Sequence, residues 1–166
     1  LEADGSLREE HASAVRMETT PFLKTDYIGF FVEPGEESWL PWQDEAVRNA
    51  LSLAIDREGI ARSLRRGTVV PTRDFVPPAL VGRSAPRPIA SAVERARAAM
   101  DSVATVNPRP WPELVLSTTS DYTDLCAALQ YQWEAVGMKV RIDVVAPATH
   151  RERVANGKAV AFRKSW

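Results

Sequence analysis

The last third of the chain contains a strand, a helix and a second strand in succession, and this pattern constrains the fold most strongly. The runs "ELVLST" (113–118) and "KVRIDVV" (139–145) are short and rich in apolar and β-branched residues, which is typical of strands. Between them, apolar side chains at helical spacing form one face of a helix that Gly137 ends: Tyr122, Cys126, Leu129, Trp133 and Val136. Strands joined by a helix of this length form a right-handed βαβ unit and are parallel.

Further strands are expected on either side of this unit. Near the N-terminus, Val15, Met17 and Thr19 alternate with charged residues, which predicts a half-exposed strand, and the apolar run "YIGFFV" (27–32) predicts a buried one. After the βαβ unit, a short helix around "THRERVANG" (149–157) and a strand "AVAFRKSW" (159–166) follow. The sequence therefore predicts an α/β fold in which helices flank a mixed β-sheet.

Two helical patterns between residues 44 and 67 are joined at "AIDREG" with no loop between them. In the first, Asp44 is the predicted N-cap, and the apolar face consists of Val47, Ala50, Leu51, Ala54 and Ile55. In the second, Asp56 is the predicted cap and Gly67 the stop, with an inner face made by Ile60, Ala61 and Leu64.

A proline-rich segment (68–90) without a consistent period separates this helix pair from a third helix. We expect that segment to be extended and irregular. Ser91 and Glu94 have the S-x-x-E spacing of a capping box, which predicts that the third helix starts at Ser91. Its buried stripe is predicted to be Val93, Ala96, Met100 and Val103.

The composition indicates one domain and excludes some partners. A chain of 166 residues with 45% apolar content can bury one core, so we expect residues 1–166 to form a single α/β lobe. The net charge of −1 comes from 21 basic and 22 acidic side chains that are spread along the chain, which argues against nucleic-acid partners. No apolar run reaches the roughly 20 residues that span a bilayer. Because both ends resemble cut ends, we expect a fragment of a longer protein.

Candidates for catalysis or metal binding are few. Cys126 could act as a thiol nucleophile with His11 or His150 as the base, but its place on an apolar helix face favours a core thiol. Two histidines and one cysteine far apart in sequence provide no metal-ligand spacing, so no metal site is predicted. No phosphate-binding or nucleophile motif is present, and no cofactor is predicted.

The tryptophans leave a further alternative open. Trp39 and Trp42 in "SWLPW" could stack on a ligand or cover the start of the first helix as a hydrophobic staple, and covering is the preferred interpretation. Two functions remain open at this point. One is a small hydrolase or transferase domain, and the other is an interaction domain that uses "SWLPW" and "NPRPWP" (107–112) as an exposed patch.

Several motifs in order resemble the family 5 extracellular solute-binding proteins, which are the peptide- and oligopeptide-binding components of bacterial ABC importers. These motifs are "DYIGF" (26–30), "VRNALSLAIDREGI" (47–60), Gly67, Pro71 and "FVPPAL" (75–80). The resemblance covers the chain from about Val15 to Trp166. Phe31 stands where the family usually has Asn, and Asn49 where Gln is usual.

The resemblance implies the C-terminal lobe of a periplasmic-binding-protein-like fold of type II, in the three-domain cluster. Such a lobe is not an enzyme; it closes over a ligand and captures peptides or other small solutes for import. The implied partner is the permease of the ABC importer, and a monomer is expected. The implied location is periplasmic or extracellular, and a lipoprotein anchor is compatible with it.

The resemblance also implies the ligand-binding residues. In oligopeptide-binding members, a strand ending in R-x-x-W runs into the cleft, where the Arg faces peptide carboxylates and the Trp packs on side chains. The matching positions are Arg163 and Trp166. An Asp that follows the Trp in the family and pairs with the peptide amine would lie beyond the last residue. Arg153, predicted on the turn before the strand, is a third candidate, and the alternative for Arg163 is a solvent-facing arginine.

Overall fold

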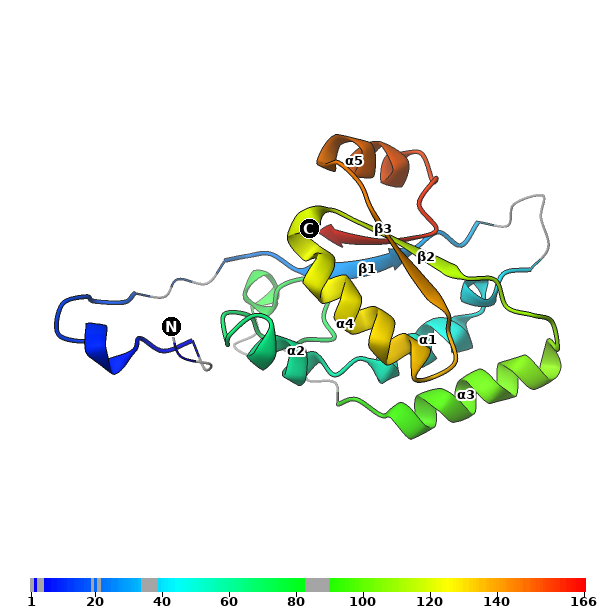
Figure 1. Cartoon of the computed structure of the whole chain (residues 1–166), viewed down its shortest axis with the longest axis horizontal. Coiled ribbons are helices and arrows are strands. Elements are labelled where there is room, and N and C mark those ends of the chain that lie inside the picture. The colour runs from blue at the N-terminus through cyan, green and yellow to red at the C-terminus, as the bar shows by residue number, and fades with distance from the viewer. Residues whose placement is uncertain (1, 3–4, 19, 21, 34–38, 83–89) are drawn as a thin grey trace. The chain divides into compact units, whose positions relative to one another are not determined.

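The computed structural model describes residues 2, 5–18, 20, 22–33, 39–82 and 90–166 (Figure 1). The chain divides into two compact units. The first comprises Leu1–Thr25, Arg57–Ile89 and Trp166, and the second comprises Asp26–Asp56 and Ala90–Ser165. The prediction of a single lobe over residues 1–166 stays a prediction.

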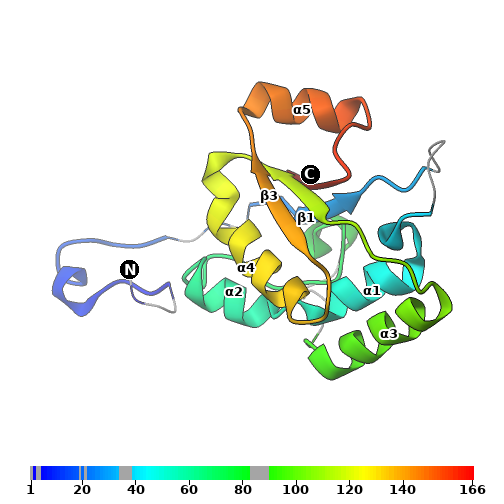
Figure 2. The same ribbon diagram turned by 45° about the vertical axis from the view of Figure 1, so that its right-hand side comes forward.

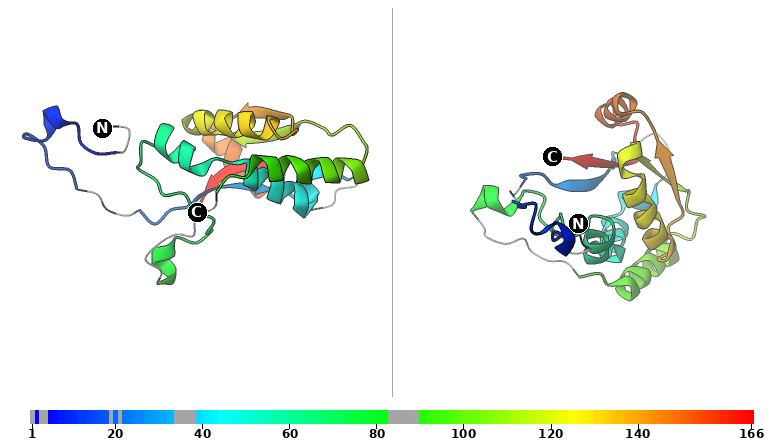
Figure 3. Two further views of the ribbon diagram at one scale, coloured as in Figure 1. Left: turned by 90° about the horizontal axis from the view of Figure 1, so that it is seen from below. Right: turned by 60° about the vertical axis from the view of Figure 1, so that its left-hand side comes forward.

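A four-stranded mixed sheet in the order β1-β4-β2-β3 is the centre of the second unit. Its strands are β1 (Asp26–Phe30), β2 (Leu114–Thr118), β3 (Val140–Val144) and β4 (Ala161–Ser165). β2 is parallel to β3 and to β4, whereas β1 pairs antiparallel with β4, beside which it runs in Figure 3. The predicted strand–helix–strand unit with parallel strands is therefore confirmed, as is the mixed sheet.

Helices cover both faces of this sheet. The helices described in this unit are α1 (Glu45–Ala54), α3 (Val93–Val106), α4 (Thr123–Glu134) and α5 (Pro147–Ala155), and its short 3-10 turns are η2 (Pro41–Gln43) and η4 (Ser120–Tyr122). α1 and α3 lie side by side (Figures 1 and 2). α4 packs on β2 and β3, and Trp133 on α4 lies 6.1 Å from Phe30 of β1, ring centre to ring centre. α5 covers the opposite face, since its His150 bonds to Ser117, whose side chain alternates with that of Leu116.

The core forms where the sequence predicts it on α1 and α4. The buried members of the two predicted apolar faces are Val47, Ala50, Leu51, Ala54, Ile55, Cys126, Leu129, Trp133 and Val136. Trp133 Nε1 donates a hydrogen bond of 3.0 Å to the Leu51 carbonyl, which joins the two helices. Gly137, with φ of 94°, ends α4 as predicted.

The start of α1 is held by two side chains. The Asp44 carboxylate accepts a 2.8 Å hydrogen bond from the Ala46 amide, which confirms the predicted N-cap. Arg48 donates to the carbonyls of Trp42 and Gln43, at 2.9 and 2.8 Å, and so joins the helix to η2. Trp42 is buried, in agreement with a covering role, while Trp39 is half-buried and meets Trp111 edge to face.

The first unit contains little regular structure among its described residues. Its elements are η1 (Glu9–His11), α2 (Arg57–Ser63) and η3 (Pro78–Val81). Thr25 and Trp166 exchange two backbone hydrogen bonds, at 3.1 and 3.3 Å. α2 ends at Ser63, earlier than the predicted stop at Gly67, because the intervening residues form turns and Arg66 already has a positive φ of 47°.

Three other predictions from the sequence are wrong. Residues 15–18 form no strand; Val15 instead bonds back to the His11 carbonyl in a turn, and Thr19 lies outside the described residues. The run 27–32 is a strand only to Phe30, and it is half-exposed rather than buried. The capping box at Ser91 does not form: α3 starts at Val93, because the Ala92 amide is bonded to the Leu53 carbonyl at 2.9 Å. Val93 is accordingly exposed.

Candidate ligand-binding site

Arg163 lies near the carboxyl end of β4, and its side chain projects from the face of the sheet that α4 covers. Alternation along the strand places it on the same side as Ala161, which pairs in register with Leu116 of β2. Tyr122, in the turn that follows β2, is the aromatic neighbour on this side. The carboxyl ends of parallel strands are where open α/β folds bind ligands, so this end is the candidate site.

The guanidinium of Arg163 is held by three side chains. Its Nη2 donates to the Asp26 carboxylate and, at 2.6 Å, to Ser165 Oγ. Ser165 Oγ in turn donates to Asp26 Oδ1 at 2.7 Å. The guanidinium carbon stands 3.1 Å from the centre of the Tyr122 ring, a cation–π contact. We name Asp26, Tyr122, Arg163 and Ser165 the arginine cluster.

One buried donor of Arg163 has no partner among the described residues. Arg163 is 9% exposed, and its Nε is buried and makes no hydrogen bond with any described residue. The alternative of a solvent-facing Arg163 is therefore wrong. An arginine with this environment is locked in one orientation by charge, hydrogen bonds and ring stacking together.

A buried histidine fixes the backbone of β4 from the other face. His150 on α5 is 8% exposed, and its Nε2 lies 2.8 Å from the Arg163 carbonyl, which can only accept; Nε2 therefore carries the proton. The other ring nitrogen, Nδ1, is hydrogen-bonded to Ser117 Oγ at 3.0 Å. This network ties α5 to β2 and β4, and it supports the strand that carries Arg163.

Arg153 lies on the opposite face of the sheet from the Arg163 side chain. It belongs to the last turn of α5, not to the turn before β4 where the sequence predicted it. Its Nη1 donates to Asp143 Oδ2 at 2.6 Å, and Asp143 pairs in register with Ser117 on the α5 face. The structure therefore does not bring Arg153 and Arg163 together.

Trp166 belongs to the first unit and has an exposed indole. The residue is 48% exposed, and its ring meets Phe75 edge to face, with ring centres 5.9 Å apart. Phe75 is itself 51% exposed. The two rings give the first unit an exposed apolar surface.

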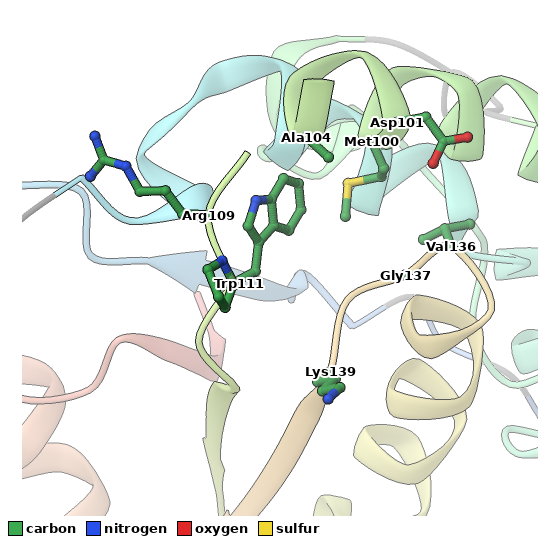
Figure 4. Close-up of a pocket in the computed structure, with 9 residues that line it drawn as sticks. Met100, Asp101, Ala104, Arg109, Trp111, Val136, Gly137 and Lys139 are labelled. Carbon is green, nitrogen blue, oxygen red and sulfur yellow. The ribbon is translucent and has the colours of Figure 1, made fainter. Parts of the chain in front are cut away.

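A shallow pocket of about 330 Å³ lies at the other end of the sheet (Figure 4). Its walls come from α3, from the segment before β2 and from the turn before β3, so it adjoins the amino ends of these strands. The lining residues are Met100, Asp101, Ala104, Arg109, Pro110, Trp111, Val136, Gly137 and Lys139. Most of them are exposed, and the pocket contains none of the residues predicted to bind ligand.

The described residues offer little for catalysis. Cys126 is fully buried on α4 and does not line the pocket, and His150 is engaged by Ser117 and the Arg163 carbonyl. No group of three or more His, Cys, Asp or Glu side chains that could hold a metal ion occurs in the part of the chain that the structure describes. Within the same residues, no helix has the length and apolar character needed to cross a membrane.

The mixed sheet flanked by helices, with a polar cluster at the carboxyl ends of its strands, defines a lobe of the periplasmic-binding-protein class. The chain belongs to the bacterial extracellular solute-binding proteins, family 5. The sequence model for the middle region of this family matches residues 2–166. A search of curated protein sequences found no match.

Solved structures share the fold. A periplasmic oligopeptide-binding protein from Borrelia burgdorferi has a TM-score of 0.74 at 21% identity, covering 87% of this chain and 28% of its own. The murein tripeptide binding protein of Escherichia coli has a TM-score of 0.71 at 24% identity, and the match covers 88% of this chain and 29% of that protein. OppA of Listeria monocytogenes, bound to peptide, has a TM-score of 0.75 at 15% identity, and the match covers 87% of this chain and 31% of that protein. The chain thus spans less than a third of the length of these proteins.

Sequence reasoning found one member of the arginine cluster and missed three. In the sequence, Asp26 stands out only as the first residue of the motif "DYIGF", Ser165 only as part of a predicted strand, and Tyr122 only as part of a predicted helix face. A charged residue directly before an apolar strand, as in "DYIGF", was the one available signal for Asp26. This signal can be interpreted only when the strand that pairs with β1 is known.

Proposed function

We propose that this chain forms one wall of the binding site of a receptor that captures peptides for an ABC importer. Family membership over residues 2–166 supports the solute-binding part of the proposal. The peptide part draws on the proteins of similar fold, two of which are described as oligopeptide-binding or bound to peptide. Capture would proceed by closure of two lobes around the ligand, without chemistry on it.

The arginine cluster is the observation that carries the proposal. It places a charged, hydrogen-bonded group at the carboxyl ends of the strands, and its geometry is fixed before a ligand arrives. We propose that Arg163, held in place by this cluster, belongs to the ligand-facing side of the wall. We also propose that the indole of Trp166 offers an apolar surface to ligand side chains. Arg153, paired with Asp143 on the α5 face, has less support, and we leave it outside the proposed site.

The proposal includes a location and a partner. The family consists of extracellular solute-binding proteins, so we propose that the protein works as a monomer outside the cytoplasmic membrane. A lipid anchor is compatible with this location. Its partner there would be the permease of the importer. No residue set described above favours an enzyme, and the proposed function is binding alone.

A fluorescence titration tests the proposal. The chain is titrated with a pool of di- to pentapeptides up to millimolar concentration, since one wall leaves most of a ligand in water and binds weakly. We expect a saturable change in Trp fluorescence that Trp166→Phe reduces and Arg163→Ala weakens. Arg141→Ala is the matched control, because Arg141 pairs with Glu113 at the surface of β3 and should bind like wild type. Absence of a saturable change would overturn the proposal of peptide capture.

A further inference from the structure

We infer that His150 on α5 is a positioning residue of the candidate site. It holds the carboxyl ends of β2 and β4 at a fixed separation, and this spacing places the Arg163 guanidinium against the Tyr122 ring. The inference rests on the proposed function for what the site binds, and it adds to that function a residue on the opposite face of the sheet. His150 lies in none of the motifs that mark the family in this sequence.

The first argument is the direction of the Arg163 carbonyl. β1 and β4 are antiparallel, and the Phe31 amide donates to the Val160 carbonyl at 2.9 Å, so the backbone polar groups of Val160 are directed toward β1. Along a strand of an antiparallel pair, alternate residues direct these groups toward the partner strand and away from it. Arg163 follows Val160 by an odd number of positions, so its carbonyl is directed away from β1 and toward β2.

The second argument is that the pairing between β2 and β4 ends before Arg163. In the described part of the chain, these two strands pair only up to Ser117 and Phe162, whereas β2 continues beside β3 to Thr118. A buried carbonyl without a hydrogen-bond donor costs free energy. The Arg163 carbonyl accepts instead from His150 Nε2, at 2.8 Å, so a side chain from α5 takes the place of a strand amide.

The third argument is that the imidazole spans both strands. Its Nδ1 is hydrogen-bonded to Ser117 Oγ on β2 at 3.0 Å, and its Nε2 to the Arg163 carbonyl on β4. On the other face of the sheet, the Arg163 guanidinium lies 3.1 Å from the centre of the ring of Tyr122, which follows β2. Both contacts cross the same gap between β2 and β4, one on each face. A change of the gap at His150 therefore moves the guanidinium relative to the ring.

α5 docks through this imidazole rather than through an apolar face. Of the residues of α5, all of which the structure describes, only His150 is buried. A second polar contact, from Arg153 to Asp143, is partly exposed. A helix of a globular protein usually docks through an apolar stripe. The buried position of α5 is thus used for two hydrogen bonds and not for packing alone.

Two variants of His150 test the inference, with the Nε–H signal of Arg163 in ¹H–¹⁵N spectra as the readout. This Nε is buried, so its proton exchanges slowly with water, and the ring current of Tyr122 shifts the signal upfield. Arg163→Lys identifies the signal by its loss. His150→Gln places an amide nitrogen near the position of Nε2 and can still donate to the Arg163 carbonyl. His150→Asn places its nitrogen near the position of Nδ1 and cannot reach that carbonyl.

We expect His150→Asn to move the Arg163 signal downfield, because the guanidinium shifts away from the Tyr122 ring. The exchange rate should rise about tenfold, since loss of a hydrogen bond to a buried carbonyl changes a local opening equilibrium by roughly this factor. His150→Gln should keep the wild-type chemical shift and an exchange rate within about threefold of wild type. Arg153→Ala is the matched control on α5. It removes the contact with Asp143 and leaves β4 untouched, so it should keep the wild-type chemical shift.

Ser117→Ala is a second variant in case His150→Asn does not fold. It removes the contact of the imidazole with β2 and keeps the bond to β4, so the Arg163 signal should again move downfield. An unchanged signal in His150→Asn or, where that variant does not fold, in Ser117→Ala would overturn the inference. Equal changes in His150→Asn and His150→Gln would also overturn it, because the packing of the ring and not the hydrogen bond would then be the cause.

Peptide titrations separate this inference from the proposed function. Wild type and His150→Asn are titrated with the pool of di- to pentapeptides, and we expect the variant to bind about threefold to tenfold more weakly, because its guanidinium is no longer held in place before binding. Equal binding by the two chains would overturn His150 as a positioning residue of the site, while peptide capture stands. Absence of binding by wild type would overturn the proposed function, whereas the Arg163 signal would still decide whether His150 holds the two strands.

Discussion

The guanidinium of Arg163 on β4 pairs with the carboxylate of Asp26 on β1, 137 residues earlier in the chain. The two strands are antiparallel neighbours, and Asp26 lies opposite Ser165 in their register. The ion pair therefore closes a cross-strand contact that Ser165 completes. It gives the candidate site a fixed charge arrangement and gives the sheet edge part of its stability.

Removing Arg163 should destabilise the chain, because Asp26 and the buried surface around the guanidinium lose their partner. Breaking a fully buried pair costs about 3–5 kcal/mol, and we expect Arg163→Ala to cost about 2–3 kcal/mol since Asp26 is partly exposed. The measurement is the midpoint and slope of urea unfolding followed by circular dichroism. Arg141→Ala, which breaks an exposed pair, should cost less than about 1 kcal/mol. Equal costs for the two variants would contradict a structural role for the cluster.

Gly157 should tolerate alanine less well than Gly137. Both have positive φ, of 67° and 94°, which costs an L-residue about 1–2 kcal/mol. A Cβ at Gly157 would also lie 2.7 Å from Cε2 of Phe31, whereas a Cβ at Gly137 meets nothing within 4 Å. We expect the Gly157→Ala variant to be about 1 kcal/mol less stable than Gly137→Ala in thermal unfolding.

The added cost at Gly157 should depend on the Phe31 ring. In a Phe31→Ala background the clash is absent, so Gly157→Ala and Gly137→Ala should then cost the same within about 0.5 kcal/mol. A difference that persists in this background would show that the ring is not its cause.

Trp133 should be the residue of α4 most sensitive to substitution. It is 1% exposed and donates to the Leu51 carbonyl, so Trp133→Phe leaves that buried carbonyl without this donor and should cost about 1–3 kcal/mol. Trp133→Ala removes the ring as well and should cost about 3–5 kcal/mol. Urea unfolding measures both. Tyr131→Ala, on the same helix but 77% exposed, should stay within about 0.5 kcal/mol of wild type, and a larger loss would argue against the packing described.

The two predicted helix caps should behave differently. Asp44 accepts a hydrogen bond from Ala46, and Asp44→Ala should cost about 1 kcal/mol. Ser91 lies outside α3 and makes no cap, so Ser91→Ala should change stability by less than about 0.5 kcal/mol. Thermal unfolding of the two variants under one set of conditions checks this, and a similar loss in both would mean that the capping box at Ser91 forms in solution.

Much of the second unit could be predicted from local patterns. The apolar spacing on α1 and α4, the Asp44 cap and the strands β2 and β3 follow from interactions between residues close in the chain, and all of these are observed. One of the predictions that failed involves a distant contact. The start of α3 is set by a bond from Ala92 to Leu53, and residues 15–18 form no strand although their pattern alternates.

In the candidate site, too, local features follow from the sequence and contacts between distant residues do not. An arginine on the last predicted strand, in a motif that resembles a ligand-binding one, is evident from the sequence, because residue type and spacing are local properties. The partners of Arg163 become known only from the folded chain. Its partner Asp26 comes from the far end of the chain, and strand pairing brings the two together. Charge pairing and burial depend on distance in space, which no local pattern encodes.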